Sequence, residues 1–228
     1  MALHMPGAVA VIAQRLASRA RARSGGSLLV ALSGIDASGK GYTATLLDRA
    51  LERHGIHTAL IHADDWLSPP RQRFGSPRSA RHFFENAFRF DAMFSQVVRP
   101  LRRDRRLDVT LTLGGESGFL RRRSYRFSDV DVVLLEGIFL LRRELLPTYD
   151  RTIWIDCTFS TALERALRRN QEGLSPEQLE HDYRTIYFPA QQLHVTRDAP
   201  RERAGLVLLN DDRLAPAEHA HERASSAA

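Results

Sequence analysis

The chain has 228 residues, of which 43% are hydrophobic and 26% charged, so it is long enough and apolar enough for one folded α/β domain. Its net charge is +6, but the arginines are spread along the chain without an aromatic-interleaved basic motif, so we expect no nucleic-acid partner. The single cysteine, Cys157, and the lack of a leader-like or membrane-spanning apolar run favour a cytoplasmic location without a membrane partner.

The first predicted elements lead to a glycine-framed loop. Residues 8–23 have the apolar spacing of an amphipathic helix, and a glycine pair ends it. An apolar strand is predicted at residues 27–33, and a helix at residues 43–53. Between them, residues 34–41 read GIDASGKG, which matches the phosphate-binding template G-x-x-x-x-G-K-[ST] in all but its last position.

This loop has the features of a nucleotide phosphate site. Its glycines allow main-chain N–H groups to point inward at phosphate oxygens, and the following helix would direct its N-terminal dipole at the same group. Lys40 is the only lysine among 33 basic residues, so an arginine-rich chain has kept a compact ammonium where it must enter a narrow phosphate cage. The predicted nucleotide-binding residues are Gly34, Ile35, Asp36, Ala37, Ser38, Gly39, Lys40, Gly41, Tyr42 and Thr43.

The position after Lys40 departs from the template. Gly41 stands where a serine or threonine hydroxyl usually coordinates Mg²⁺. Thr43 is one substitute, although it lies further along the chain. We favour the alternative that the metal keeps its waters and that carboxylates hold those waters, because Mg²⁺ dehydrates reluctantly.

Acidic residues follow two predicted strands. The strand at residues 58–63 runs into Asp64 and Asp65, and the strand at residues 130–137 delivers Glu136 near its end. Because the carboxyl ends of parallel strands face the ligand crevice, we expect these carboxylates to take part in chemistry and Glu136 to hold metal-bound water. The alternatives are a helix cap or solvated turn at residues 64–65, and an apolar strand that happens to end in glutamate.

The remaining segments complete an alternating α/β pattern. Residues 67–81 are rich in Pro, Arg, Ser and Gly, which predicts a mobile lid or substrate loop. A helix is predicted from residue 88 to Arg105, with Asp91 in its first turn, and a hairpin at residues 109–127. Further predictions are a strand at residues 152–157, helices at residues 160–170 and 175–187, a last strand at residues 203–210 and a flexible tail.

Two arginines share one face of the helix at residues 160–170. Arg165 and Arg169 are four positions apart, which places their Cα atoms on the same side of a helix. Arginines that close over a transferring phosphate are a recurrent device in phosphoryl transfer. Solvated arginines are the alternative in a chain of this composition.

Four stretches together resemble a known family. Residues 34–41 (GIDASGKG), 63–66 (ADDW), 88–91 (FRFD) and 131–137 (DVVLLEG) occur in the order found in the uridine kinase-like branch of P-loop kinases. That branch includes uridine-cytidine, nicotinamide riboside and pantothenate kinases and phosphoribulokinase. The resemblance implies an α/β P-loop kinase fold with a five-stranded, mainly parallel sheet, helices on both faces, a small hairpin and a helical lid.

The resemblance also implies a division of the chain. Residues 1–26 would form an N-terminal helix and linker, and residues 27–212 the kinase domain. The hairpin insertion would occupy about residues 107–127 and the lid about residues 160–190. Residues 213–228 would form the flexible tail, and a homo-oligomer is compatible with this plan.

Roles for individual residues follow from the same resemblance. It implies ATP and Mg²⁺ as cofactors and transfer of the γ-phosphoryl group to a primary hydroxyl. The implied catalytic residues are Asp64 as general base, with Lys40, Arg165 and Arg169 on the phosphates. The implied substrate-binding residues are Asp64, Phe90, Asp91 and Arg165, and Glu136 and Asp64 would hold Mg²⁺ through water.

The acceptor stays open because parts of the family pattern are missing. Residues 112–117 lack the aromatic-acid-aromatic stretch of uridine-cytidine kinases, and Asp182 precedes Tyr183 where the family has glutamine. Asp91 still matches a ribose-binding acid, so a nucleoside or other riboside is the first expectation. The alternatives are a pantothenate-like or sugar-phosphate acceptor, GTP as the donor, and a nucleotide-binding protein that has lost catalysis.

Overall fold

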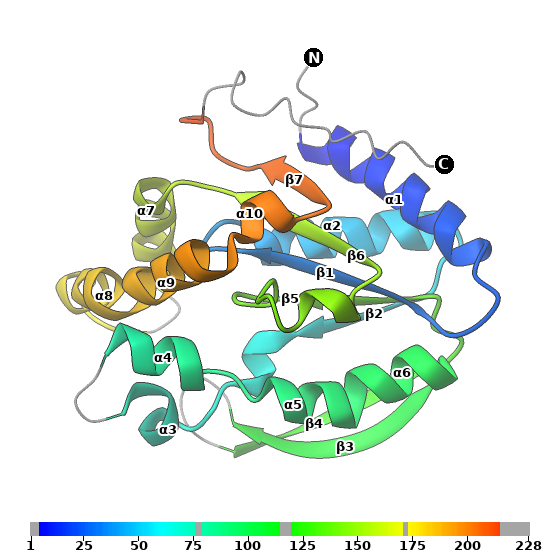
Figure 1. Cartoon of the computed structure of the whole chain (residues 1–228), viewed down its shortest axis with the longest axis horizontal. Coiled ribbons are helices and arrows are strands. Elements are labelled where there is room, and N and C mark those ends of the chain that lie inside the picture. Colours follow the sequence, from blue (N-terminus) through cyan, green and yellow to red (C-terminus); the bar gives the residue numbers. More distant parts are fainter. Residues whose placement is uncertain (1–4, 76–78, 115–119, 171–172, 215–228) are drawn as a thin grey trace.

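A parallel five-stranded sheet forms the centre of the computed structural model, which describes residues 5–75, 79–114, 120–170 and 173–214 (Figure 1). The strand order is β2-β5-β1-β6-β7, and every neighbouring pair is parallel. The strands are β1 (Leu28–Gly34), β2 (Thr58–His62), β5 (Val132–Glu136), β6 (Arg151–Asp156) and β7 (Leu206–Leu209). This arrangement confirms the predicted α/β class.

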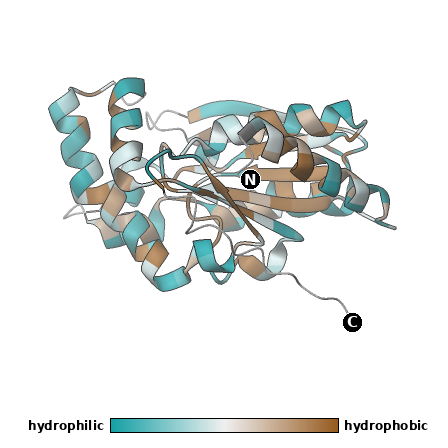
Figure 2. Cartoon of the chain, turned by 90° about the horizontal axis from the view of Figure 1, so that it is seen from above, coloured by the Kyte–Doolittle hydropathy of each residue, from teal (hydrophilic) through white to brown (hydrophobic). Residues whose placement is uncertain are grey.

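The two faces of the sheet support two separate cores. Leu28, Val30 and Leu32 of β1 pack on one face with α1 (Met5–Arg21) and α2 (Lys40–Arg53). The intervening Leu29 and Ala31 enter the core on the opposite face, because successive side chains of a strand alternate. Strands covered on both faces are apolar throughout, and Figure 2 shows apolar strands between helices with hydrophilic outer surfaces.

Helices and a hairpin cover the second face. The helices there are α4 (Ala80–Asn86), α5 (Phe90–Met93), α6 (Arg99–Asp104), α7 (Phe159–Arg169), α8 (Pro176–Asp182) and α9 (Phe188–Asp198), and α10 (Pro200–Arg203) precedes β7. The predicted hairpin is present as antiparallel β3 (Leu107–Gly114) and β4 (Leu120–Phe127). Residues 115–119, which join them, lie outside the described part, as do residues 215–228 of the predicted tail.

Part of the predicted loop at residues 67–81 is helical. It contains α3 (Pro70–Phe74) and the start of α4, while residues 76–78 are not described. Phe74 stacks on the buried Phe83 of α4 with ring centroids 5.7 Å apart, and Ser79 caps α4 by accepting a hydrogen bond from the His82 main-chain N–H. The loop expectation was wrong for these residues because the polar composition concealed an aromatic contact and a cap.

The helix predicted to end near residue 187 continues for eleven more residues, to Asp198. A π-helical turn at Tyr183–Tyr187 joins α8 to α9, and Pro189 is the second residue after it. A proline in a regular α-helix lacks an N–H and clashes with the carbonyl four residues earlier, whereas the wider π turn accommodates the ring. The same device occurs at Phe94–Val98, just before Pro100.

Among the described residues, no helix combines the length and apolar character needed to cross a bilayer.

Candidate active site

The loop between β1 and α2 has the predicted strand–loop–helix geometry. A Cβ at Gly34 would lie 2.6 Å from Ser38 Oγ and 2.7 Å from the Ile155 carbonyl oxygen, so glycine is required there. Gly39 has φ 89°, and a Cβ at this position would collide with the side-chain amide of Asn210. That amide donates a hydrogen bond to the Ser38 carbonyl oxygen at 2.7 Å, which joins the loop to the segment after β7. Helix α2 begins at Lys40, three residues earlier than predicted.

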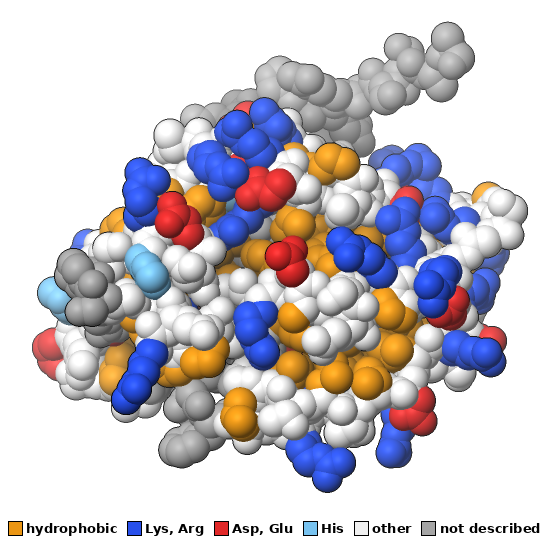
Figure 3. Space-filling model, turned by 60° about the horizontal axis from the view of Figure 1, so that its bottom comes forward, with side chains coloured by type: hydrophobic (Ala, Val, Ile, Leu, Met, Phe, Trp, Pro, Cys, Tyr) orange, Lys and Arg blue, Asp and Glu red, His pale blue; other side chains and the backbone are white. Residues whose placement is uncertain are grey.

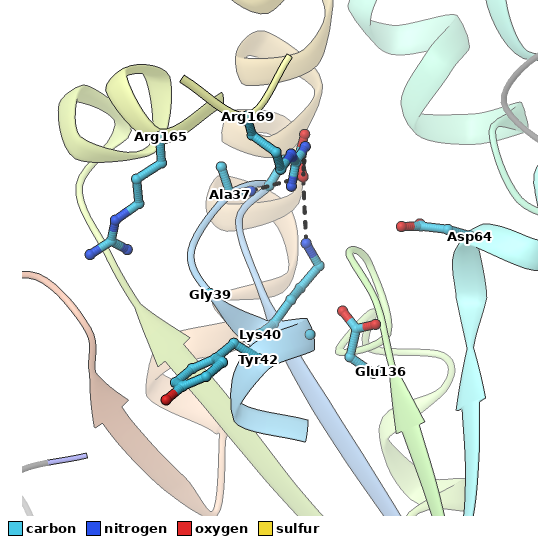
Figure 4. Close-up of a pocket in the computed structure, with 10 residues that line it drawn as sticks. Ala37, Gly39, Lys40, Tyr42, Asp64, Glu136, Arg165 and Arg169 are labelled. Atoms are coloured by element: carbon cyan, nitrogen blue, oxygen red, sulfur yellow. Dashed lines mark hydrogen bonds and ion pairs between the residues drawn. The ribbon is translucent and has the colours of Figure 1, made fainter. Parts of the chain in front are cut away.

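A cavity of about 450 Å³ lies against this loop (Figure 4). The residues that line it are Asp36, Ala37, Gly39, Lys40, Gly41, Tyr42, Asp64, Glu136, Arg165 and Arg169. Lys40 and Asp64 therefore face one cavity, although they lie on different segments of the chain. The cavity also lies at the carboxyl ends of β1, β2 and β5, which is the usual ligand edge of a parallel sheet.

Four of the predicted nucleotide-binding residues do not line the cavity. Gly34 ends β1, Ile35 belongs to the core, and Ser38 is buried. Thr43 is buried within α2, where its hydroxyl donates to the Gly39 carbonyl oxygen at 3.0 Å. The structure thus gives no support to Thr43 as the replacement for the hydroxyl missing at Gly41.

Lys40 is the cation at the centre of the cavity. Its side chain is buried, and Nζ lies 3.6 Å from Asp36 Oδ1. Burial alone would lower the pKa of Lys40, but the carboxylates of Asp36, Glu136 and Asp64 raise it above its ordinary value. Lys40 is therefore charged at neutral pH and able to bind an anion such as phosphate.

Asp36, within the loop, connects it to the helical segment over the cavity. Its carboxylate lies 3.8 Å from Arg169 Nη2 and accepts a hydrogen bond from the Tyr183 hydroxyl. Its main-chain N–H donates to Gln191 Oε1 at 2.7 Å. Burial would raise the pKa of Asp36, yet Lys40, Arg169 and Tyr183 lower it below its ordinary value. The ionised carboxylate of Asp36 thus forms ion pairs with Lys40 and Arg169, the two cations that a nucleotide phosphate would contact.

Glu136 and His62 form a pair that sequence reasoning missed. They end neighbouring strands in direct register, and His62 Nδ1 lies 2.9 Å from Glu136 Oε2. This hydrogen bond raises the pKa of His62, although burial opposes the shift. The only sequence signal was that both residues lie at the ends of strands that turned out to be neighbours, 74 positions apart.

The donor set fits a hydrated magnesium ion. Glu136 and Asp64 line the same cavity, and a Cβ at Gly41 would lie 3.8 Å from Glu136 Oε2, an ordinary van der Waals distance, so Gly41 adjoins this carboxylate. Within the described ranges, no group of three or more His, Cys, Asp or Glu side chains could hold a metal ion. Such a site suits an ion that keeps several waters and takes phosphate oxygens as ligands.

Asp64 and Asp65 have different surroundings. Both lie in the short 3₁₀ turn Ala63–Trp66 that follows β2. Asp64 is exposed to the cavity, whereas Asp65 Oδ2 forms an ion pair with Arg123 Nε of β4 at 3.2 Å. The structure therefore presents Asp64, and not Asp65, to a molecule in the cavity.

The two predicted lid arginines contact different parts of the loop. Arg169 lies at Asp36, near Lys40. Arg165 donates to the Asn210 carbonyl oxygen at 2.8 Å and to the Ser38 carbonyl oxygen at 3.4 Å. Figure 4 shows Arg165 pointing away from Asp64, on the other side of the loop. Arg165 and Asp64 thus line the same cavity from different sides of Lys40.

The predicted sugar-binding pair is also absent from the cavity lining. Phe90 is buried and stacks on Phe88 with ring centroids 5.1 Å apart, so it serves the core. Asp91 is exposed in the first turn of α5. Neither residue lines the cavity, so the structure gives no direct support to ribose recognition by Asp91.

The fold and the loop geometry define a P-loop kinase fold, and solved structures share it. No family model matches the chain. A protein described as a possible uridine kinase from Bacillus stearothermophilus has a TM-score of 0.63 and 21% identity, covering 86% of this chain and 98% of its own. A protein assigned as a fructose transport system kinase from Silicibacter sp. TM1040 has a TM-score of 0.71 and 20% identity, covering 88% and 98%.

A D-glycerate 3-kinase from Cryptococcus neoformans extends the comparison. It has a TM-score of 0.59 and 13% identity, covering 92% of this chain and 96% of its own. At these identities the likeness establishes the fold. The chain therefore has the fold of uridine kinase-like and related P-loop kinases, over nearly the full length of those proteins.

Proposed function

We propose that this protein is an ATP-dependent kinase that transfers the γ-phosphoryl group to a primary hydroxyl of a small molecule. The observation that carries the proposal is the placement of Lys40, Asp64 and Glu136 around one cavity at the carboxyl ends of parallel strands. The fold shared with several kinases supports the same reaction class.

Each of these residues has a separate role in the proposed reaction. Lys40 and the main-chain N–H groups of the loop bind the β- and γ-phosphates, and Arg169 neutralises charge that builds up on the transferred group. Asp64 accepts the proton of the attacking hydroxyl and must lie within hydrogen-bond reach of that oxygen. Glu136 and Asp64 would hold Mg²⁺ through its waters, and the ion would supply further charge neutralisation.

The nucleobase of the phosphate donor, ATP, would bind on the side of the loop that Asp64 does not face. Tyr42 is 66% exposed and lines the cavity, and Figure 4 shows Tyr42 and Arg165 on the side of Lys40 away from Asp64. An exposed aromatic ring and a planar guanidinium both provide stacking surfaces for a nucleobase. The acceptor then approaches from the Asp64 side, opposite to the nucleobase of ATP.

The acceptor is a small molecule in this proposal. The bottom face of the molecule, which includes the hairpin, shows basic side chains interspersed with acidic and apolar ones (Figure 3). A nucleic-acid interface would instead favour one continuous basic band. A nucleoside or other riboside is one candidate, on the resemblance of residues 88–91, and a non-nucleoside alcohol is the other, since Phe90 and Asp91 do not line the cavity.

The proposal is tested by ADP release with ATP, Mg²⁺ and a panel of nucleosides, sugars and hydroxy acids. For an accepted substrate, Asp64→Asn should lower turnover about a hundredfold or more, the usual effect of a positioned base, while the Kd for ATP stays within a few fold. Asp108→Asn, on the exposed outer face of the hairpin, is the matched control.

Two results would contradict the proposal. A near-normal rate in Asp64→Asn would remove Asp64 from the role of base. ATP binding without ADP release for any acceptor would instead favour a nucleotide-binding protein that lacks catalysis.

A further inference from the structure

Three arginines outside the cavity lining belong to segments next to the turn that carries Asp64: Arg121 and Arg123 on β4, and Arg89 just before α5. We infer that the acceptor alcohol carries an anionic group, a carboxylate or a phosphate, which Arg123 and Arg121 of β4 bind together with Arg89. This inference rests on the proposed kinase function and specifies its substrate class. It is carried by the hairpin register, the contacts of these arginines and the local balance of charge.

The register of the hairpin places two arginines on its inner face. Tyr125 is paired with Val109 and is buried, and its hydroxyl accepts a hydrogen bond from Trp66 Nε1 at 3.1 Å, so this face packs on the Ala63–Trp66 turn. Side chains alternate along a strand, so Phe127, Tyr125, Arg123 and Arg121 share the face. The inner face of β4 is therefore aromatic at Phe127 and Tyr125, next to Trp66. It is basic at Arg123 and Arg121, which come earlier in the strand.

Arg123 is held beside the candidate base. Its Nε lies 3.2 Å from Oδ2 of Asp65, the residue after Asp64, and its side chain is 51% exposed. The ion pair keeps the guanidinium beside Asp65 and leaves much of the group accessible to solvent. A planar guanidinium at this position is suited to bidentate recognition of a carboxylate or phosphate.

Arg89 is a partly buried cation with little compensation. Its guanidinium carbon lies 5.9 Å from the centroid of the Trp66 ring, and its main-chain N–H donates to the Trp66 carbonyl oxygen at 3.0 Å. Nε and Nη2 are covered by protein and have no hydrogen-bond partner among the described residues. Removing a cation from water without a counter-charge is costly, so an anion bound next to Trp66 would be favourable.

The local charges distinguish an anionic acceptor from a neutral one. Asp65 is the acid paired with Arg123, and Asp64 is reserved for the attacking hydroxyl. Among the ion pairs of the described residues, the one that involves Arg89, Arg121 or Arg123 is that of Arg123 with Asp65. A neutral nucleoside offers no charge to balance the excess, whereas a hydroxy acid or a phosphorylated alcohol does.

The test compares alcohols that differ only in charge. Glycerol, glycerate and glycerol 3-phosphate form one set, and pantothenol and pantothenate another, with initial rates followed by ADP release. We expect kcat/KM for at least one anionic member to exceed that of its neutral counterpart by a hundredfold or more. The carboxylate and phosphate arms show which anion the site prefers. Equal use of neutral and anionic members would overturn the inference.

Substitutions of individual arginines test where the anionic group of the acceptor binds. Arg123→Gln should raise KM for the anionic acceptor at least tenfold with little change in kcat or in the Kd for ATP, and Arg89→Lys should raise it by a smaller factor. Arg126→Gln is the matched control, because Arg126 lies on the same strand but on the outer face, paired with Asp108. Equal effects of Arg123→Gln and Arg126→Gln would overturn the assignment.

A failure of the kinase proposal is distinguishable from a failure of this inference. If no member of the panel releases ADP, the kinase proposal fails for these acceptors, and binding is then measured by thermal unfolding with the same compounds. Anionic members should raise the Tm of the wild type and of Arg126→Gln but not of Arg123→Gln. Equal shifts in all three proteins, or no shift in any, would overturn the anion site.

Discussion

Asp36→Asn removes an internal anion from the phosphate loop. Asp36 Oδ1 lies 3.6 Å from Lys40 Nζ and 3.8 Å from Arg169 Nη2. The same two cations are proposed to bind the γ-phosphate, so the carboxylate competes with ATP for them. Asparagine keeps the size of the side chain and the oxygen that accepts the Ala37 main-chain N–H, but it removes the charge.

The size of the effect follows from the two ion pairs. The side chains of Asp36 and Arg169 are 25% and 36% exposed, so solvent screens this pair, whereas the Lys40 side chain is 8% exposed and its pair with Asp36 is screened less. Each pair contributes about 0.5–1 kcal/mol. Loss of both pairs therefore favours nucleotide binding by about 1–2 kcal/mol. At about 1.4 kcal/mol per factor of ten, the Kd for ATP should fall roughly 5- to 30-fold.

Calorimetry with ATP and Mg²⁺ measures this change. Tyr183→Phe is the control, because it removes the hydroxyl bonded to Asp36 but leaves both ion pairs, so the Kd should change by less than about threefold. The gain from Asp36→Asn should shrink at high salt, which screens exposed charges. An unchanged or weaker affinity in Asp36→Asn would refute the idea that Asp36 competes with the phosphates.

Two further predictions concern the metal and the stability of the fold. Gly41→Ser would place its Cβ 3.8 Å from Glu136 Oε2 and its hydroxyl beside this carboxylate, so it should lower the Mg²⁺ concentration for half-maximal activity several fold; an unchanged Mg²⁺ titration would count against this position for the ion. Asp211 accepts hydrogen bonds from the Thr158 N–H and hydroxyl at 2.9 and 2.6 Å; burial would raise its pKa, but these bonds lower it. Its ionised form therefore stabilises the fold above the unfolded-state pKa of about 3.9, and this contribution is lost as pH falls through the lower folded-state pKa. Asp211→Asn should lower the free energy of unfolding in urea by about 1–2 kcal/mol at pH 7 and by less near pH 3, and a pH-independent difference would contradict this reasoning.

Local patterns were sufficient for much of the site. The loop at residues 34–41 is specified by neighbouring residues, since glycines at fixed spacing determine both the turn and the position of Lys40. Asp64 and Glu136 were predictable because each follows an apolar strand, and parallel strands bring their carboxyl ends to one edge. These rules require no knowledge of which strands are neighbours.

Other features depended on distant contacts or on side-chain direction. The His62–Glu136 pair required the order of β2 and β5, and the Asp65–Arg123 pair required the hairpin to fold onto the turn after β2. Arg165 and Arg169 share a helix face, as predicted, but their long side chains diverge, and i,i+4 spacing does not determine that direction.

The remaining differences between the sequence predictions and the structure involve proline and aromatic residues. The helix passes Pro189 because a π turn precedes it, and a local rule that stops helices at proline does not foresee that turn. The resemblance assigned Phe90 to substrate binding, whereas its burial and its stacking on Phe88 show that it packs in the core. Composition alone also concealed the helices between residues 67 and 81.

The central claim is that Lys40 and Asp64 act on the same phosphoryl group from opposite sides. A crystal structure with Mg²⁺ and a non-hydrolysable ATP analogue tests it most directly. We predict the γ-phosphate within hydrogen-bond distance of Lys40 Nζ, and the Asp64 carboxylate across from it with room for one hydroxyl between them. A triphosphate bound away from Lys40, or an Asp64 side chain directed into a different cavity, would contradict the claim.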